Sequence, residues 1–322
     1  MNLLKSQKGV DWSLIIIVNF LWATQVPVIR FIGNSLGPVA IAFIPTITST
    51  LMLIPFLLLE NKKRNIPLRW RWNEVKDFIV PGLIGIFIMQ YAFTIGSQRT
   101  LAANAGIITL TIPVIVAIFS TVLLSEKLNP VRILSFVLAI AGVLLTSISD
   151  ISGSNFQQGQ YFAGNLIFLF ACSCCGFYNT YVKKLIEKGN TEIEILVYCS
   201  LVGSIASIPL FIWVEPFNIM AFLHSGDKAI WGIIELSVFV YAVSWILFLS
   251  VLKRIDVTQA ILGTYLMPFF IALLGIVLLG ENMTLLMIIG GAIILLSTLL
   301  VTVYENSLTN FLNKFSLKKK LI

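Results

Sequence analysis

Charged residues are scarce in this sequence, and histidine is almost absent. Lys, Arg, Asp and Glu make up 11% of the 322 residues, whereas a soluble globular protein is typically about 25% charged. His224 is the single histidine, which removes most histidine-based acid–base and zinc chemistry. The sequence also lacks a Gly-rich loop of the phosphate-binding type, so we do not expect direct use of ATP.

Cysteine is also sparse, and its positions do not suggest a disulfide framework or a metal site. Cys172, Cys174, Cys175 and Cys199 lie within apolar stretches, where a thiol behaves as a small apolar side chain. We therefore expect neither a metal nor a cofactor. An enzymatic function is not expected either.

Hydrophobic residues, in contrast, make up 58% of the chain and gather in ten long runs. Most runs contain close to the ~20 residues that a helix needs to cross ~30 Å of hydrocarbon. The runs are continuous rather than alternating, which favours helices over a membrane β-barrel. We expect an all-α polytopic membrane protein with ten transmembrane helices. The runs are 13–30, 37–59, 78–98, 103–125, 131–149, 161–182, 193–213, 229–252, 256–279 and 284–304.

The basic residues are distributed unevenly between alternate connections. If the N-terminus is cytoplasmic, 19 of the 22 Lys and Arg residues fall on the cytoplasmic side, and only Arg30, Arg99 and Lys228 fall outside. Positive charge concentrates on the cytoplasmic side of membrane proteins. We therefore predict cytoplasmic N- and C-termini in a cell (plasma) membrane and a retained first span. The net charge of +7 then reflects contact with anionic lipid headgroups rather than with nucleic acid.

Two stretches that lie 155 residues apart resemble each other. Seven residues from Arg99 to Glu126 recur at this offset between Arg254 and Glu281, including Pro113 and its counterpart Pro268. The offset separates five-helix halves, and because five is odd the second half must enter the membrane from the opposite side. We predict two inverted halves, 1–150 and 151–322, an organisation typical of secondary transporters.

One pattern recurs in both halves. An apolar helix that contains small residues, a proline and a terminal Glu is followed by a helix that contains glycine. It consists of Ala102, Ala103, Ala105, Pro113, Glu126 and Gly142, and of Ala260, Pro268, Gly280, Glu281, Gly290 and Gly291. Over nearly the whole chain, this pattern resembles EamA-type transporters of the drug/metabolite transporter superfamily. The resemblance implies a central cavity lined by helices 1, 3, 4, 6, 8 and 9, with helices 5 and 10 peripheral. It leaves the substrate open, because the family moves amino acids, nucleosides, other metabolites and drugs.

Polar and aromatic side chains inside the apolar runs are candidates for substrate binding, because hydrocarbon penalises them unless they face a cavity or a partner. Trp22 and Gln25 share a helical face, and interhelical hydrogen bonding is the alternative role for this pair. Gln90 and Thr94 belong to a stripe that recurs every four residues. The candidates are Trp22, Gln25, Gln90, Tyr91, Thr94, Tyr178, Tyr241, Trp245, Thr264 and Tyr265.

The eighth run carries an aromatic face and the most conspicuous acid within a span. Trp231, Glu235 and Trp245 are expected on one face, which suits stacking on a planar or cationic solute. Glu235 lies about two turns from the expected outer end. It either binds a cationic group or a coupling proton, or lies at the headgroups if the helix begins later.

Two prolines and two glutamates recur in register between the halves. Pro113 and Pro268 are expected to kink their helices, either as purely structural bends or as gating bends. Glu126 and Glu281 each precede good N-cap residues of the next helix. We predict that both carboxylates are structural and lie beside the N-termini of helices 5 and 10.

These features favour a secondary active or facilitative transporter of small metabolites that works by alternating access, with export as the expected direction. Amino acids or similar amphiphilic solutes fit an uncharged aromatic and amide cavity, whereas polyanions need buried Lys or Arg. The alternative is a membrane-embedded lipid-modifying enzyme or a lipid flippase-like protein. An enzyme of that kind needs a cluster of catalytic residues at a membrane face, and the sequence offers none. The expected oligomeric state is a monomer or a weak homodimer.

Overall fold

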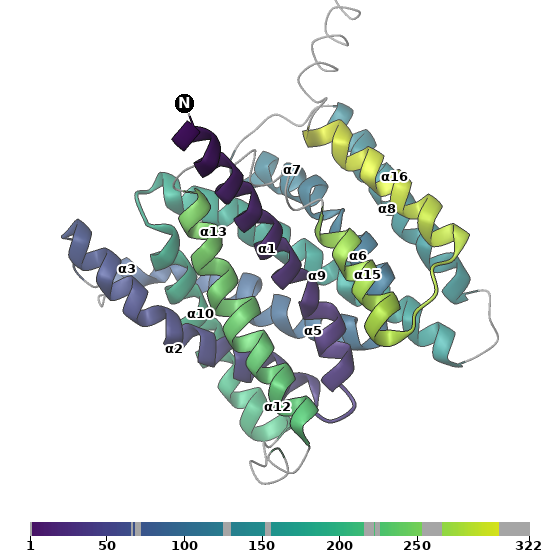
Figure 1. Cartoon of the computed structure of the whole chain (residues 1–322), viewed down its shortest axis with the longest axis horizontal. Helices are drawn as coiled ribbons and strands as arrows, with labels where there is room; N and C mark the ends of the chain where they lie inside the picture. The colour runs from purple at the N-terminus through teal and green to yellow at the C-terminus, as the bar shows by residue number, and fades with distance from the viewer. Residues whose placement is uncertain are drawn as a thin grey trace, which may run out of the picture.

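The computed structural model describes residues 2–65, 67, 72–124, 130–151, 156–215, 222, 226–252 and 266–302. All the elements within these residues are helical. Seven helical stretches are long and apolar enough to cross a membrane, and three shorter apolar helices accompany them. The long helices lie side by side in a bundle (Figure 1). The chain is therefore an all-helical, multi-pass membrane protein.

The elements before residue 152 supply the first five apolar stretches. The segments from α3 to α5 follow one another without a break, so one long stretch contains several helix types. The elements are α1 (Asn2–Ile32), α2 (Pro38–Arg64), α3 (Trp72–Val75), η1 (Lys76–Phe78), α4 (Ile79–Gly82), η2 (Leu83–Ile88), α5 (Met89–Arg99), α6 (Ala102–Thr109), α7 (Ile112–Leu123) and α8 (Pro130–Ile151).

The elements after residue 155 supply the other five stretches. Here too, segments of different helix type join into longer spans, such as the one from Asp227 to Val251. The elements are α9 (Phe156–Glu187), α10 (Glu192–Pro209), η3 (Leu210–Val214), α12 (Asp227–Ile234), η4 (Glu235–Val243), α13 (Ser244–Leu252), α15 (Met267–Leu279) and α16 (Leu285–Thr302).

Local sequence signals determine several helix ends. Pro38 occupies the first turn of α2, where its missing amide hydrogen costs nothing, and Asn65 ends the helix with a left-handed φ of 54°. At the start of α10, the Glu194 amide donates to the Thr191 hydroxyl at 3.2 Å, and the Thr191 amide donates to the Glu194 carboxylate at 3.0 Å. This reciprocal capping box satisfies two amides that the helix itself leaves unpaired.

The fourth apolar run, expected as one helix over 103–125, is broken in its middle. α6 ends at Thr109 and α7 begins at Ile112, with Pro113 in the first turn of α7. The Leu110 amide donates to the Ile107 carbonyl at 3.1 Å, which is a tighter turn than the α-helix makes. The Leu110 carbonyl accepts a hydrogen bond from the Thr298 hydroxyl of α16 at 2.6 Å. A neighbouring helix therefore satisfies backbone that the break exposes.

Three of the long stretches contain a π-helical segment, and two of these segments lie in corresponding positions. η2 covers Leu83–Ile88 and η4 covers Glu235–Val243. Residues 83–88 shifted by 155 become 238–243, which lie inside η4. π-helical turns are rare and occur frequently at functional sites. The similarity between the two parts of the chain therefore includes a local distortion as well as the sequence.

The packing of the helices pairs the two parts of the chain with each other. α1 packs against α15, α13 and η4, and α9 packs correspondingly against α7, α5 and η2. α2 packs against α10, α6 against α15, and α8 against α16. α8 and α16 expose large apolar side chains such as Val137, Leu144, Ile288 and Leu296 on their outer faces, as lipid-facing helices do.

A close crossing of α8 and α16 depends on two glycines. A Cβ atom built at Gly290 would lie 2.7 Å from the Gly142 carbonyl oxygen and 2.5 Å from the Thr146 Cγ2 atom. A Cβ atom at Gly142 would lie 2.8 Å from the Gly290 carbonyl oxygen. Small residues allow membrane helices to approach this closely, and the packing itself drives their association.

We expect Gly290→Ala to destabilise the protein by about 1–3 kcal/mol, because the added methyl group overpacks the α8–α16 crossing. Gly291→Ala is the matched control, since a Cβ atom at that position meets nothing closer than 3.4 Å. The stability of both variants is measured as the midpoint temperature of thermal unfolding in detergent. Equal midpoints for the two variants would show that the crossing tolerates a methyl group.

Candidate functional site

Polar and aromatic side chains from α1, α5, η4 and α13 meet inside the bundle. The Gln25 side-chain amide donates to the Tyr241 hydroxyl at 2.7 Å, and both side chains are buried. Gln90 of α5 lies close to the Tyr241 hydroxyl. These three residues form a chain, here called the amide–tyrosine chain. Residues that are more than 200 positions apart in the sequence thus share one hydrogen-bonded unit.

An aromatic cluster adjoins this chain. The ring centroid of Trp22 lies 5.4 Å from that of Trp245 and 5.0 Å from that of Phe248. The Trp22 indole nitrogen donates to the Ser244 hydroxyl at 2.9 Å, and that hydroxyl donates to the Val240 carbonyl. Trp22 is therefore held in one orientation by a hydrogen bond as well as by ring contacts. We call Trp22, Trp245 and Phe248 the aromatic cluster.

Glu235 lies at the start of η4, facing α1. One carboxylate oxygen, Oε1, is hydrogen-bonded to the Thr24 hydroxyl. The other, Oε2, is buried and has no hydrogen-bond partner among the described residues. The side chain is half-buried, so it lies inside the bundle rather than fully exposed at its rim. A carboxylate in such a position costs free energy and is usually retained for function.

The stripe on α5 is directed into the bundle. Thr94 is fully buried, and its hydroxyl has no partner among the described residues. The Ser97 hydroxyl and the Gln98 amide nitrogen are also buried without a hydrogen-bond partner among the described residues. Tyr91 is half-buried, with its ring 5.1 Å from that of Phe87. Buried polar groups are normally hydrogen-bonded, so this row is suited to contact water or a solute.

Tyr178 occupies a different environment from the other aromatic candidates. It is buried in an apolar cluster with Ile86, Leu196 and Cys199, against which Trp245 packs from the side. A Cβ atom built at Gly85 of η2 would lie 2.2 Å from its Cδ2 atom. Tyr178 therefore packs on the backbone of η2, and no hydrogen bond joins it to the amide–tyrosine chain among the described contacts.

The π-helical η4 changes the face on which residues of the eighth run lie. The α-helical spacing predicts Trp231 on the same face as Glu235 and Trp245, but Trp231 is 68% exposed. π-type turns use more residues than α-helical turns, so the 3.6-residue spacing does not carry across Glu235–Val243. The spacing that places Trp231 and Trp245 on one face therefore does not hold along this span.

The prolines begin helices, and two candidates lie outside the described residues. Pro113 and Pro268 each stand in the first turn of a helix, α7 and α15 respectively. Thr264 and Tyr265 fall outside the residues that the structure describes, as does Glu126. Within the described part of the chain, no group of three His, Cys, Asp or Glu side chains could hold a metal ion.

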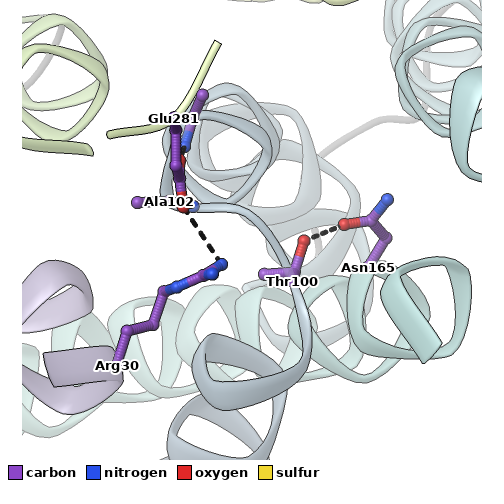
Figure 2. A network of polar contacts seen from close by, with 6 residues as sticks. Arg30, Thr100, Ala102, Asn165 and Glu281 are labelled. Carbon is purple, nitrogen blue, oxygen red and sulfur yellow. Dashed lines mark hydrogen bonds and ion pairs between the residues drawn. The ribbon is translucent and has the colours of Figure 1, made fainter. Parts of the chain in front are cut away.

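Glu281 joins two distant parts of the chain at one end of the bundle (Figure 2). Its two carboxylate oxygens accept hydrogen bonds from the Ala102 and Ala103 amides at 2.9 and 3.0 Å. The Arg30 guanidinium lies 3.2 Å from the same carboxylate. The carboxylate therefore caps α6, whereas the sequence predicts it beside α16. The Met287 amide of α16 instead donates to the Thr284 hydroxyl at 3.2 Å.

Glu215 makes a second cap of this kind. Its carboxylate oxygens accept hydrogen bonds from the Val39 and Ala40 amides, at 3.0 and 3.1 Å, at the N-terminus of α2. Beside the Glu281 cap, the Thr100 hydroxyl donates to the Asn165 side chain (Figure 2). Sequence reasoning missed Glu215, and no local signal marks it, because the helix that it caps lies 175 residues away.

The sequence profile of the EamA-like transporter family matches the chain twice, over residues 12–148 and 162–303. The chain belongs to the EamA-like transporter family. It is a membrane transporter and not an enzyme. The two matched regions correspond to two duplicated units of helices.

Individual relatives of this EamA-family transporter are distant but extend over most of the chain. A chloroplastic WAT1-related protein of Arabidopsis thaliana is 22% identical over 92% of this chain and 70% of its own length. An uncharacterized transporter of Archaeoglobus fulgidus is 22% identical over 90% of this chain and 98% of its own length. A protein of Streptantibioticus cattleyicolor named probable terminal-alkyne amino-acid exporter is 22% identical over 92% and 94%.

A solved crystal structure has the same fold as this EamA-family transporter. The superposition covers 92% of this chain and 99% of the chain in that structure, with a TM-score of 0.61 and 17% sequence identity. At this level of identity, the likeness concerns the fold alone.

Proposed function

We propose that the chain is a secondary carrier that moves small amphiphilic metabolites, amino acids or similar solutes, by alternating access, with export as its direction. Its two inverted halves are 1–150 and 151–322. The observation that carries the proposal is the hydrogen bond from Gln25 of the first half to Tyr241 of the second, next to the Trp22–Trp245 pair. A site between inverted halves is the usual location for substrate in such carriers.

Three features support the exchange of roles between the halves. The neighbours of α1 in the second half mirror the neighbours of α9 in the first. The π-helical segments η2 and η4 lie in corresponding positions. Pro113 and Pro268 recur at the same offset, each in the first turn of a helix, and the helix starts there would serve as gating bends.

The chemistry of the site supports an amphiphilic solute. The amide–tyrosine chain and the aromatic cluster offer hydrogen bonds and ring faces, and neither contains Lys or Arg. Ring faces bind apolar and cationic groups, while amides and hydroxyls orient carboxylates and amines. The distant relative named probable terminal-alkyne amino-acid exporter agrees with this class of substrate. Tyr91, Thr94 and Tyr178 extend the proposed surface along α5 and α9, and Thr264 and Tyr265 would complete it.

The position of the charges supports cytoplasmic termini in a plasma membrane and contact of the basic segments with anionic lipids. In that orientation, Arg30 and Glu281 belong to the outer face. The caps made by Glu281 and Glu215 would then join the two halves at the outer face and close that end of the bundle. We propose a monomer or a weak homodimer as the working unit.

Counterflow in proteoliposomes tests the proposal without knowledge of the driving force. Vesicles are loaded with an unlabelled pool of amino acids, nucleosides or phosphate esters, and a trace of labelled solute is added outside. We expect transient accumulation with the amino-acid pool and none with the phosphate esters, because none of the described side chains at the site is basic. Accumulation with no pool, from protein shown to be folded, would contradict the carrier function.

A further inference from the structure

We infer that Glu235 is a proton-binding site that couples the carrier to a proton gradient. The inference rests on the proposed function, because coupling has a meaning only in a carrier. It goes further by assigning a second ligand, the proton, to a carboxylate outside the aromatic cluster.

The Thr24 hydroxyl has two acceptors within reach but only one hydrogen. It lies 2.7 Å from the Leu21 carbonyl oxygen and also within hydrogen-bond distance of the Glu235 Oε1 atom. When Glu235 is ionised, the hydroxyl can donate to only one of these acceptors. When Glu235 is protonated, its own O–H donates to Thr24, and Thr24 donates to Leu21. A proton on Glu235 therefore satisfies both contacts at once.

The second carboxylate oxygen provides an independent reason for proton binding. Oε2 is buried without a hydrogen-bond partner among the described residues. An ionised carboxylate spreads its charge over both oxygens, and a buried acceptor without a partner bears the full cost of losing water. A proton removes the charge and with it most of that cost. The geometry thus satisfies the protonated carboxyl better than the ionised one.

The charged groups on the elements packed against η4 do not neutralise Glu235. These elements are α1, α2, α12 and α13. On α1, Arg30 is paired with Glu281, and Lys5, Lys8 and Asp11 lie more than three turns before Thr24. On α12, Lys228 directly follows Asp227, and its ammonium nitrogen lies 5.4 Å from the centroid of the Phe31 ring. α2 carries its charges at its far end, from Glu60 onward, and α13 has none. On η4 itself, Tyr241 is engaged by Gln25.

The position of Glu235 separates it from the aromatic cluster. Trp245 lies ten residues further along the same span, which corresponds to roughly 10–15 Å at helical rise. Tyr241, with its partners Gln25 and Gln90, lies between the two. A solute on the aromatic cluster would not need to touch the carboxylate. This arrangement favours a coupling proton over the cationic group of a substrate as the ligand of Glu235.

The proton would act on the contact between the two proposed halves. Thr24 belongs to the first half and Glu235 to the second. Taking up one proton converts the carboxylate to a carboxylic acid and reverses the donor in this contact, and releasing that proton restores it. No other bond is made or broken, and the proton enters from one side of the membrane and leaves on the other. A carrier can couple to protons through such an exchange.

Labelling with dicyclohexylcarbodiimide tests the inference, because this reagent reacts with protonated carboxyl groups in apolar surroundings. Purified protein in nanodiscs is labelled at steps from about pH 5 to about pH 9, the range in which perturbed protein carboxyls titrate. Peptide mass spectrometry then locates the adducts. We expect an adduct at Glu235 that falls about tenfold or more across this range, since each pH unit above a group's pKa lowers its protonated fraction about tenfold.

Two carboxylates serve as internal controls in the same sample. Glu281 is paired with Arg30, and Glu194 is held in the capping box of α10. We expect little adduct on either. In Thr24→Val, which lacks the hydroxyl but keeps the size of the side chain, the pH at which labelling of Glu235 falls should shift, because the carboxyl loses the hydroxyl that exchanges donor and acceptor roles with it. Glu235→Gln should lose the adduct and retain the elution profile of a folded protein.

Three outcomes would overturn the inference: no adduct at Glu235 at any pH, an adduct that does not change with pH, or protection by sodium chloride but not by choline chloride. The last would assign the site to a sodium ion. Labelling needs no transport substrate, so its failure is distinct from a failure of counterflow. Labelling as expected without counterflow would contradict the carrier instead.

Discussion

Glu281→Ala is expected to be the most destabilising single substitution among those considered, at about 3–5 kcal/mol. It leaves the Arg30 guanidinium without its carboxylate and the Ala102 and Ala103 amides at the start of α6 without an acceptor. Loss of one partner from a buried pair is costly because the remaining charge stays desolvated. The midpoint of thermal unfolding in detergent, followed by tryptophan fluorescence, measures the effect.

A control and a double variant separate the ion pair from the helix cap. Glu187→Ala removes an exposed glutamate at the end of α9 and should change stability by less than about 0.5 kcal/mol. Arg30→Ala combined with Glu281→Ala should be more stable than Glu281→Ala alone, because no uncompensated charge remains. A Glu281→Ala variant as stable as the wild type would show that the carboxylate does not hold the two parts of the chain together.

Trp22→Ala is expected to lower the rate of counterflow about tenfold or more. The substitution removes ring contacts with Trp245 and Phe248 and the hydrogen bond to Ser244. Aromatic pairs contribute about 0.5–1.5 kcal/mol beyond their buried area, and about 1.4 kcal/mol corresponds to a tenfold change in affinity. Initial rates of labelled amino-acid uptake into preloaded proteoliposomes measure the loss.

Trp231→Ala is the matched control for this prediction. Trp231 lies in the same long stretch but is 68% exposed, so counterflow should remain within about twofold of wild type. Trp22→Phe keeps a ring and loses only the hydrogen bond, and its rate should fall between those of wild type and Trp22→Ala. If Trp22→Ala and Trp231→Ala lowered the rate equally, the aromatic cluster would not be the substrate site.

Much of the architecture follows from the sequence, because a membrane imposes simple constraints. The length and continuity of the apolar runs predict the number and positions of the helices, since lipid cannot satisfy an open backbone. The repeat from Arg99 and Arg254 predicts the duplication, and the family match at 12–148 and 162–303 agrees with it. Trp22, Gln25, Gln90, Tyr241 and Trp245 could be named as candidates because hydrocarbon penalises polar groups.

What the sequence by itself determined is thus the helical class, the duplicated plan and a set of polar side chains that must face inward. Only the tertiary structure decided their partners. Gln25 and Tyr241 are 216 residues apart, and Glu281 and Ala102 are 179 apart. The π-helical turns of η4 also break the α-helical spacing between Trp231 and Trp245. Periodicity describes a single helix, whereas a hydrogen bond between helices depends on how they pack, and that packing is a property of the whole chain.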